Sequence, residues 1–159
     1  RTLASTGSHR PMTATPVKIA LASDHAAVAL KAELAAWLRE QGHVVTDLGP
    51  DSTDSVDYPD YGFKLAAHVA SGAAEFGVAL CGSGIGISIA VNRNPACRCA
   101  LVSDSLSARL SRQHNNANVI AMGARLIGID AAKDCLAAFL ATPFEGGRHE
   151  RRVAKLTPA

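Results

Sequence analysis

The chain has 159 residues, of which 48% are hydrophobic and 19% are charged. This is an ordinary composition for a globular protein, and the length is sufficient for one domain with a full core. A net charge of +2 is too small to indicate a nucleic acid partner. No apolar run approaches the roughly 20 residues that a membrane span requires, so we expect no membrane partner.

The first fifteen residues differ from the rest of the chain. They begin without methionine, contain Gly7-Ser8-His9, and lack the apolar region of a signal peptide. We interpret residues 1–15 as a remnant of the expression vector with a disordered start, and we place the native start at Met12. Residues 16–159 are then expected to form one domain.

From residue 17 onward, short apolar runs alternate with longer amphipathic segments. Leu30, Leu34 and Leu38 follow a helical spacing, and Gly42 is the stop signal of that helix. In chain order, strands are predicted at 17–22, 43–48, 76–80, 98–102 and 118–122, and helices at 28–41, 61–71, 85–92, 104–113 and 130–140; the tail from residue 146 is a candidate for one more helix.

Strands that are separated by single helices indicate right-handed crossovers and a parallel sheet. Parallel strands are buried on both faces and read as nearly continuous apolar runs, as these mostly do. We therefore predict an α/β protein with a single-domain, three-layer α/β/α Rossmann-like fold and a five-stranded parallel sheet.

The four cysteines are Cys81, Cys97, Cys99 and Cys135. None belongs to a C-x-x-C pair, and no histidine cluster completes a zinc site by its spacing. We expect reduced thiols, a cytoplasmic location and no metal or cofactor.

A glycine-rich loop follows the third predicted strand, with the sequence Cys81-Gly82-Ser83-Gly84-Ile85-Gly86. Glycines let the backbone turn sharply and present its N–H groups to an anion. The next segment reads as a helix start, whose positive end favours a thiolate over a thiol. A thiol beside such amides indicates a site for chemistry at the carboxyl edge of the sheet.

Polar residues also follow the other predicted elements. After the first strand come Ser23, Asp24 and His25, and Tyr58 follows the second strand. His114 and Asn115 follow the fourth helix, and Arg125 follows the fifth strand. We expect these clusters to meet at the edge where a parallel sheet binds ligands.

The C-terminal tail carries Arg148 and Arg152, which share one face if the tail is helical. Two or three converging guanidinium groups indicate a dianion, most simply a phosphate.

Each of these residues also fits a purely structural role. The alternatives are a helix N-cap for Asp24, a solvated loop position for His25, plain packing for Tyr58, a buried inert thiol for Cys81, a helix dipole contact for His114, a helix C-cap for Asn115 and an exposed charged face for the basic tail. The glycine spacing also resembles the dinucleotide fingerprint, with Asp104 placed to hold a ribose. That fingerprint needs its third glycine one place later, where Ile87 stands, and normally follows the first strand of its unit.

In combination, several segments from Lys18 to about Leu156 resemble the type B ribose-5-phosphate isomerase family, which also contains galactose-6-phosphate and allose-6-phosphate isomerases. The segments that carry the resemblance are Ser23-Asp24-His25, Asp57-Tyr58-Pro59, the loop and helix from Cys81 to Ala90, the run from Ser111 to Asn115, and Gly146-Gly147-Arg148-His149.

The resemblance implies a role for each matching residue. Cys81 is implied as the proton-transferring base and His114 as the residue that opens the sugar ring, with Asp24 assisting at the anomeric hydroxyl. Ser83, where many members carry threonine, keeps the hydroxyl beside the thiol. Some members use a glutamate later in the loop, but Ile87 stands there, so Cys81 is the only base on offer. The implied substrate contacts are Asp24, His25, Tyr58, Gly82, Ser83, Gly84, Ile85, Gly86 and Asn115, and the implied phosphate ligands are Arg125, Arg148, Arg152 and His25.

The expected function is therefore aldose–ketose isomerisation of ribose 5-phosphate and ribulose 5-phosphate through an enediolate, in the pentose phosphate pathway. The family implies a homodimer or a dimer of dimers with shared active sites. An alternative is an isomerase of allose or galactose 6-phosphate. A non-catalytic phosphosugar or nucleotide-binding protein is less favoured, because it would have no use for Cys81 with His114.

Overall fold

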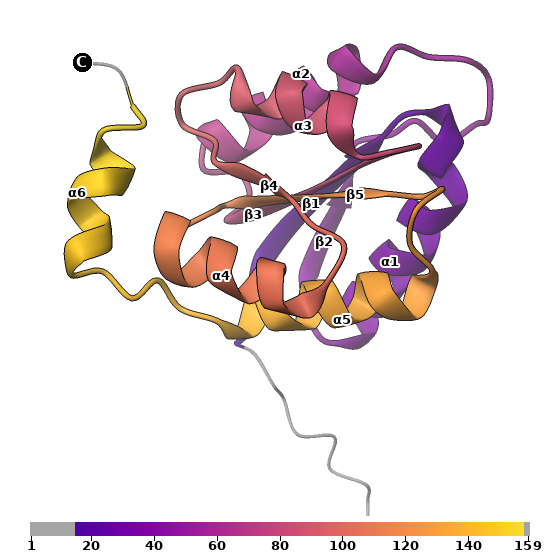
Figure 1. Ribbon diagram of the computed structural model, residues 1–159. Coiled ribbons are helices and arrows are strands. Elements are labelled where there is room, and N and C mark those ends of the chain that lie inside the picture. Colours follow the sequence, from indigo (N-terminus) through magenta and orange to yellow (C-terminus); the bar gives the residue numbers. More distant parts are fainter. Residues whose placement is uncertain (1–14, 158–159) are drawn as a thin grey trace, which may run out of the picture.

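The computed structural model describes residues 15–157 (Figure 1). The predicted vector remnant and the Met12 start lie outside the described residues, apart from Thr15. Five parallel strands form one sheet in the order β2-β1-β3-β5-β4. The strands are β1 (Lys18–Ser23), β2 (Val44–Asp47), β3 (Phe76–Cys81), β4 (Cys99–Leu101) and β5 (Val119–Gly123).

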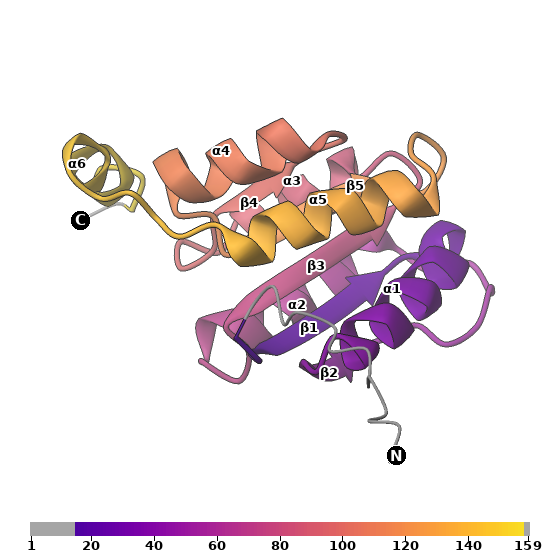
Figure 2. The same cartoon turned by 90° about the horizontal axis from the view of Figure 1, so that it is seen from below.

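Six α-helices accompany the sheet among the described residues, and five of them cover its two faces. They are α1 (Val28–Glu40), α2 (Tyr58–Ala70), α3 (Ile85–Asn92), α4 (Ser105–Asn115), α5 (Ile129–Ala141) and α6 (Arg148–Ala154), with a short 3₁₀ turn at His25–Ala27. Figures 1 and 2 show α2 and α3 on one face and α1, α4 and α5 on the other. The predicted three-layer fold is confirmed.

Alternation along β1 explains why both faces are covered. Ile19 and Leu21 pack in one buried cluster with Phe139 of α5. Ala20 and Ala22 face the opposite way and pack in a second cluster with Leu65 of α2. A strand that is apolar on both faces needs helices on both sides of the sheet.

Some predicted boundaries differ from the structure. Helix α2 begins at Tyr58 rather than at residue 61, because proline is tolerated in a first helical turn and Pro59 occupies that turn. Helix α4 continues through Asn115 and ends where Asn116 adopts a left-handed φ of 45°. His114 therefore belongs to the last turn of α4 and does not follow the helix.

The order of the strands fixes the position of the site. The chain passes from β1 to β2 on one side of β1 and then crosses to β3 on the other side. Ligands of open α/β sheets bind at such a reversal, beyond the carboxyl ends of the strands. There the N–H of Asp24 donates to the carbonyl of Leu80 at 3.1 Å, which joins the ends of β1 and β3.

Helix α6 lies outside the three layers, beyond the C-terminal end of α4 (Figures 1 and 2). The backbone N–H of Glu145 donates to the carbonyl of Gln113 at 3.1 Å and ties the preceding loop to α4. Within residues 15–157, none of the helices combines the length and apolar character needed to cross a membrane.

Candidate active site

A cavity of about 320 Å³ opens at the carboxyl ends of β1 and β3. This volume falls at the small end of the range for ligand pockets, about 300–1,000 Å³. The cavity is lined by Asp24, His25, Ala26, Tyr58, Cys81, Gly82, Ser83, Gly86, Arg125 and Leu126. It therefore brings together eight residues that the sequence analysis singled out and two, Ala26 and Leu126, that it missed.

Cys81 is the last residue of β3, and its side chain is buried at the base of this cavity. The backbone N–H of Gly84 donates to Cys81 Sγ at 3.1 Å. The sulfur therefore has a fixed partner in the glycine-rich loop. The Gly84 amide thus holds the sulfur of Cys81 in place.

The loop after Cys81 depends on close backbone contacts. Gly84 has a φ of +76°, and a Cβ there would lie 2.7 Å from the carbonyl carbon of Met122. A Cβ on Gly86 would lie 2.7 Å from the Tyr58 ring, so this ring packs directly on the first turn of α3. The N–H of Ile85 donates to Ser83 Oγ at 3.2 Å.

These contacts divide the residues of the predicted anion hole into two groups. Gly82, Ser83 and Gly86 line the cavity, whereas Gly84 and Ile85 do not. The amides of Gly84 and Ile85 are used by Cys81 Sγ and Ser83 Oγ. The amide of Gly86 lies in the first turn of α3, where N–H groups have no intrahelical acceptor, and it is available to an anion.

Asp24 and His25 form one wall of the cavity. Asp24 Oδ1 accepts a hydrogen bond from the N–H of Ala26 at 3.0 Å, so the N-cap role that we considered is present. The carboxylate also lines the cavity, so the structural role does not exclude a chemical one. His25 Nδ1 lies 3.1 Å from the nitrogen and 3.2 Å from the oxygen of Val56, which leaves Nε2 for a ligand.

Arg125 supplies the positive charge of the cavity. Its backbone N–H donates to the carbonyl of Gly82 at 2.9 Å, and its guanidinium stem lies over Gly82, 3.4–3.5 Å from the position of a Cβ there. The side chain is exposed and borders the cavity as a phosphate ligand should.

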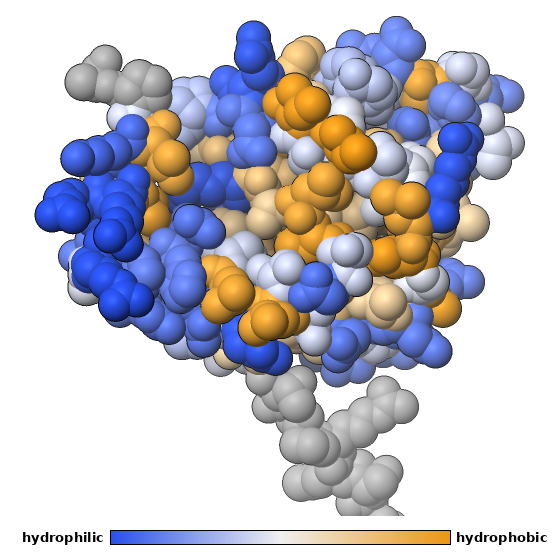
Figure 3. Space-filling view, viewed as in Figure 1, coloured by the Kyte–Doolittle hydropathy of each residue, from blue (hydrophilic) through white to orange (hydrophobic). Residues whose placement is uncertain are grey.

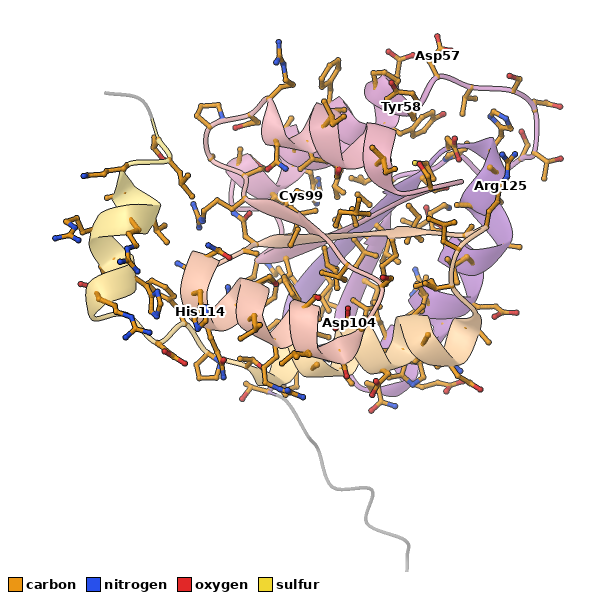
Figure 4. The ribbon with its side chains drawn as sticks, viewed as in Figure 1. Asp57, Tyr58, Cys99, Asp104, His114 and Arg125 are labelled. Carbon is orange, nitrogen blue, oxygen red and sulfur yellow. The ribbon has the colours of Figure 1, made fainter. Side chains whose placement is uncertain are left out.

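The remaining predicted site residues do not reach this cavity within one chain. His114 and Asn115 lie in the last turn of α4, and Arg148 and Arg152 lie on α6. Crossover helices run antiparallel to the strands. The C-terminal end of α4 therefore lies near the amino ends of the strands, whereas Cys81 lies at their carboxyl ends. The 11 residues of α4 separate its two ends by about 16 Å. Figure 4 shows His114 far from Tyr58 and Arg125.

The expectation that all the polar clusters meet at one edge was therefore wrong for a single chain. It treated the residues after a helix like the residues after a strand. The two groups lie at opposite ends of the strands, so the predicted site is divided into a Cys81 cavity and a His114 region.

In the His114 region, the rings of His114 and His149 stack with centroids 4.5 Å apart and planes 16° apart. Glu145 Oε2 lies 3.5 Å from His149 Nε2. We expected no cluster of candidate metal ligands from the spacing, yet among the described residues these three side chains lie close enough together to be one. Sequence separation concealed it, because two helices and a loop supply the members.

Asp104 has a structural role away from the cavity. Its carboxylate accepts from the N–H of Ser107 at 2.7 Å and from Ser107 Oγ at 2.8 Å, and so caps α4. These hydrogen bonds lower the pKa of Asp104. The capping contacts occupy the carboxylate that a ribose would need in the dinucleotide interpretation.

The other three cysteines are unsuited to proton transfer. All four cysteines are free, as predicted. Burial raises the pKa of Cys97 and of Cys99, and it raises the pKa of Cys135 to about 11. Burial thus disfavours the thiolate of these three residues, and Cys81 is the cysteine that lines the cavity.

The family model described as Ribose/Galactose Isomerase matches residues 19–156. The chain belongs to this family. It is 44% identical over 140 residues to ribose-5-phosphate isomerase B of Escherichia coli, a match that covers 88% of this chain and 94% of that protein. It is 40% identical over 141 residues to D-erythrulose-4-phosphate isomerase of Pectobacterium atrosepticum, covering 88% of this chain and 93% of that protein.

The fold agrees with the family assignment. The crystal structure of a ribose 5-phosphate isomerase from Thermotoga maritima matches with a TM-score of 0.87 and 50% identity, and the match covers 89% of this chain and 97% of that chain. Residues 19–156, which the family model matches, include the Cys81 loop, α4 and all of α6, so both halves of the divided site lie within the family's fold.

Proposed function

We propose that this protein is an aldose–ketose isomerase that interconverts ribose 5-phosphate and ribulose 5-phosphate. The observation that carries the proposal is the geometry of Cys81, a buried thiol that accepts the Gly84 N–H at 3.1 Å on the floor of a cavity bordered by Arg125. It unites a proton acceptor, donors for an oxyanion and a cation for a phosphate.

In the proposed chemistry, Cys81 removes the proton from C2 of the open-chain aldose and returns it at C1. The intermediate is an enediolate, whose developing negative charge needs hydrogen-bond donors. The Gly86 amide and Ser83 are the nearest candidates on the cavity wall. A single oxyanion donor is typically worth about 2.7–4 kcal/mol in such reactions.

Ribose 5-phosphate is mostly a closed furanose, so a proton donor must open the ring first. We assign this step to His114, with Asp24 at the anomeric hydroxyl. Within one chain, His114 and Cys81 lie at opposite ends of the strands. We therefore propose that His114 acts on the cavity of a second copy. Asn115, Arg148 and Arg152 would come from the same second copy, and the two arginines would join Arg125 and His25 at the phosphate.

An exposed apolar surface supports a homodimer or a dimer of dimers. Ile85 and Ile89 of α3, Leu101 of β4 and Leu106 of α4 are between 45% and 59% exposed. Figure 3 shows apolar side chains gathered over these elements. Strand β4 is also an edge strand of the sheet. Surfaces of this kind are the usual sites of association between copies.

The names of two relatives of this chain indicate sugar phosphates with different numbers of carbon atoms. Ribose-5-phosphate isomerase B and D-erythrulose-4-phosphate isomerase are both relatives at 40% identity or more. We favour the five-carbon phosphate, because the distance between Cys81 and the phosphate ligands fixes the span, and a misplacement near 1 Å can cost about 100-fold. Allose or galactose 6-phosphate is the alternative substrate. The finer context that we propose is a cytoplasmic step of the pentose phosphate pathway.

The direct test is to supply ribose 5-phosphate and to detect ribulose 5-phosphate. Measuring kcat/KM for ribose 5-phosphate, allose 6-phosphate, galactose 6-phosphate and erythrose 4-phosphate in parallel then ranks the substrates. A hexose or tetrose phosphate that equals the pentose would overturn the span argument. No turnover of any of them would overturn the proposal as a whole.

A further inference from the structure

The side chains of His114, Glu145 and His149 form a compact group that we call the His–Glu–His cluster. Each offers one ligand atom, and these atoms all lie within 4.8 Å of one another. His149 is 7% exposed, whereas Glu145 is exposed and His114 is half-buried. The cluster therefore has a buried base and an open side.

The backbone holds the three members together. His114 lies in the last turn of α4, and the N–H of Glu145 donates to the carbonyl of the adjacent Gln113 at 3.1 Å. Gly146 and Gly147 then take positive φ values of 68° and 56°. This conformation turns the chain back, so that His149 on α6 reaches the His114 ring. The arrangement is thus built by main-chain contacts and does not depend on chance side-chain contact.

Two imidazole nitrogens and a carboxylate oxygen are a ligand set that zinc binds in proteins, with an open fourth position. At a metal–ligand distance of about 2.0–2.1 Å, neighbouring ligands of a tetrahedral zinc lie roughly 3.3 Å apart. Glu145 Oε2 and His149 Nε2 are already 3.5 Å apart. The ligand atoms of the cluster lie up to 4.8 Å apart, so His114 has to approach by up to about 1.5 Å. Its ring also has to turn out of the stack with His149, because the lone pairs of two parallel imidazole rings do not converge on one ion.

We propose that the His–Glu–His cluster is a binding site for a divalent cation of the zinc class. The arginines of α6, Arg148, Arg151 and Arg152, raise the local positive charge and lower its affinity for a cation. The site therefore binds zinc when it is supplied in excess and is not a structural zinc centre that the fold requires.

The consequence for activity rests on the proposed function. A ring nitrogen of His114 that gives its lone pair to zinc can no longer carry or accept a proton. Zinc bound at the cluster therefore removes the group assigned to ring opening. The isomerase reaction needs no metal, and occupancy of this site inhibits it reversibly.

The first experiment measures binding without substrate. Zinc chloride is titrated into the full-length protein by calorimetry, and Co²⁺ is used as a spectroscopic probe. We expect one ion per chain and the visible bands of tetrahedral Co²⁺, without the near-ultraviolet band of a thiolate ligand. Glu145→Gln and His149→Gln should each weaken binding by at least about 10-fold, the lower limit for losing even an outer-shell partner. Glu145 is exposed, so its variant keeps the test valid if His149→Gln does not fold.

Matched controls are Glu40→Gln at the end of α1 and His68→Gln on α2, which lie outside the cluster. Both should bind zinc as the wild type does. Absence of zinc binding, equal binding by the cluster variants and the wild type, or a thiolate band with Co²⁺ would each overturn the proposed site.

The second experiment measures inhibition of ribose 5-phosphate turnover by zinc and its reversal by a chelator. Glu145→Gln should need at least about 10-fold more zinc for half inhibition, relative to its own activity. A protein that binds zinc at the cluster but never turns over sugar phosphates would refute the proposed function and leave the site intact. An active enzyme whose cluster binds no zinc would refute only the site.

Discussion

Gly84→Ala is expected to damage both the fold and the proposed chemistry, because Gly84 has two structural functions. Its φ of +76° belongs to the left-handed region, which costs an L-residue about 1–2 kcal/mol. The new Cβ would also lie 2.7 Å from the carbonyl carbon of Met122 and 2.8 Å from Leu101 Cδ1. Overpacking of this kind typically costs about 1–3 kcal/mol more. We expect the free energy of unfolding to fall by about 2–5 kcal/mol.

The effect on turnover follows from the hydrogen bond that the loop would lose. The Gly84 N–H donates to Cys81 Sγ at 3.1 Å, and hydrogen bonds to charged groups are worth about 1.5–3 kcal/mol. If the loop moves away from Met122, kcat should fall by about 10- to 150-fold. The decrease in kcat measures the loss of the hydrogen bond from the Gly84 N–H to Cys81. The decrease in the free energy of unfolding measures the backbone strain and the steric clash at Gly84.

Gly42→Ala is the matched control. Gly42 also has a positive φ, +93°, but a Cβ there meets nothing within 4 Å. Gly42→Ala should lower the free energy of unfolding only by the conformational cost of about 1–2 kcal/mol, and its kcat should stay unchanged. Urea unfolding and steady-state kinetics of both variants give the comparison. If Gly84→Ala matches Gly42→Ala in stability and in kcat, the proposed contact between the loop and the thiol is wrong.

Three further predictions test other parts of the structure. Cys81→Ala should lose turnover by about 10²–10⁴-fold, as expected for an acid–base group, yet still bind a phosphorylated hydroxamate; retention of a tenth of the activity would remove Cys81 as the base. His114→Ala should slow ribose 5-phosphate more than erythrose 4-phosphate, which cannot form a furanose, and equal losses on the two would contradict the ring-opening role. Burial lowers the pKa of His43 below its ordinary 6.5, and its Nδ1 accepts the Val17 N–H. The unfolded chain therefore binds more protons below about pH 6.5, so Tm should fall on acidification. The decrease in Tm on acidification should be smaller for His43→Gln than for the wild type. A decrease of the same size in both proteins would contradict this linkage.

The sequence was sufficient to predict the layers of the fold and the Cys81 cavity. Alternating apolar runs and helical periods are local signals, and a strand such as β3, buried along its whole length, leaves little ambiguity. Residues at the ends of strands meet by the geometry of a parallel sheet. This is why Asp24, Cys81 and Arg125 were correctly expected in one place.

The positions of the residues on and after α4 could not be predicted in this way. A helix that returns across the sheet carries its C-terminal residues to the opposite edge, so His114 could not share a cavity with Cys81 in one chain. The cluster with Glu145 and His149 depends on how the α5–α6 loop folds back onto α4. The contact of Val56 with His25 likewise joins residues that no local pattern relates.

In the proposed dimer, Cys81 of one chain and His114 of another complete each active site for isomerisation of ribose 5-phosphate. Mixing the inactive variants Cys81→Ala and His114→Ala under conditions that exchange subunits tests it directly. Random pairing in a symmetric dimer makes half of the dimers mixed, and each mixed dimer contains one intact site and one doubly defective site. The mixture should therefore recover about one quarter of the wild-type specific activity. A mixture that exchanges subunits but has no more activity than its two parents would contradict the shared site.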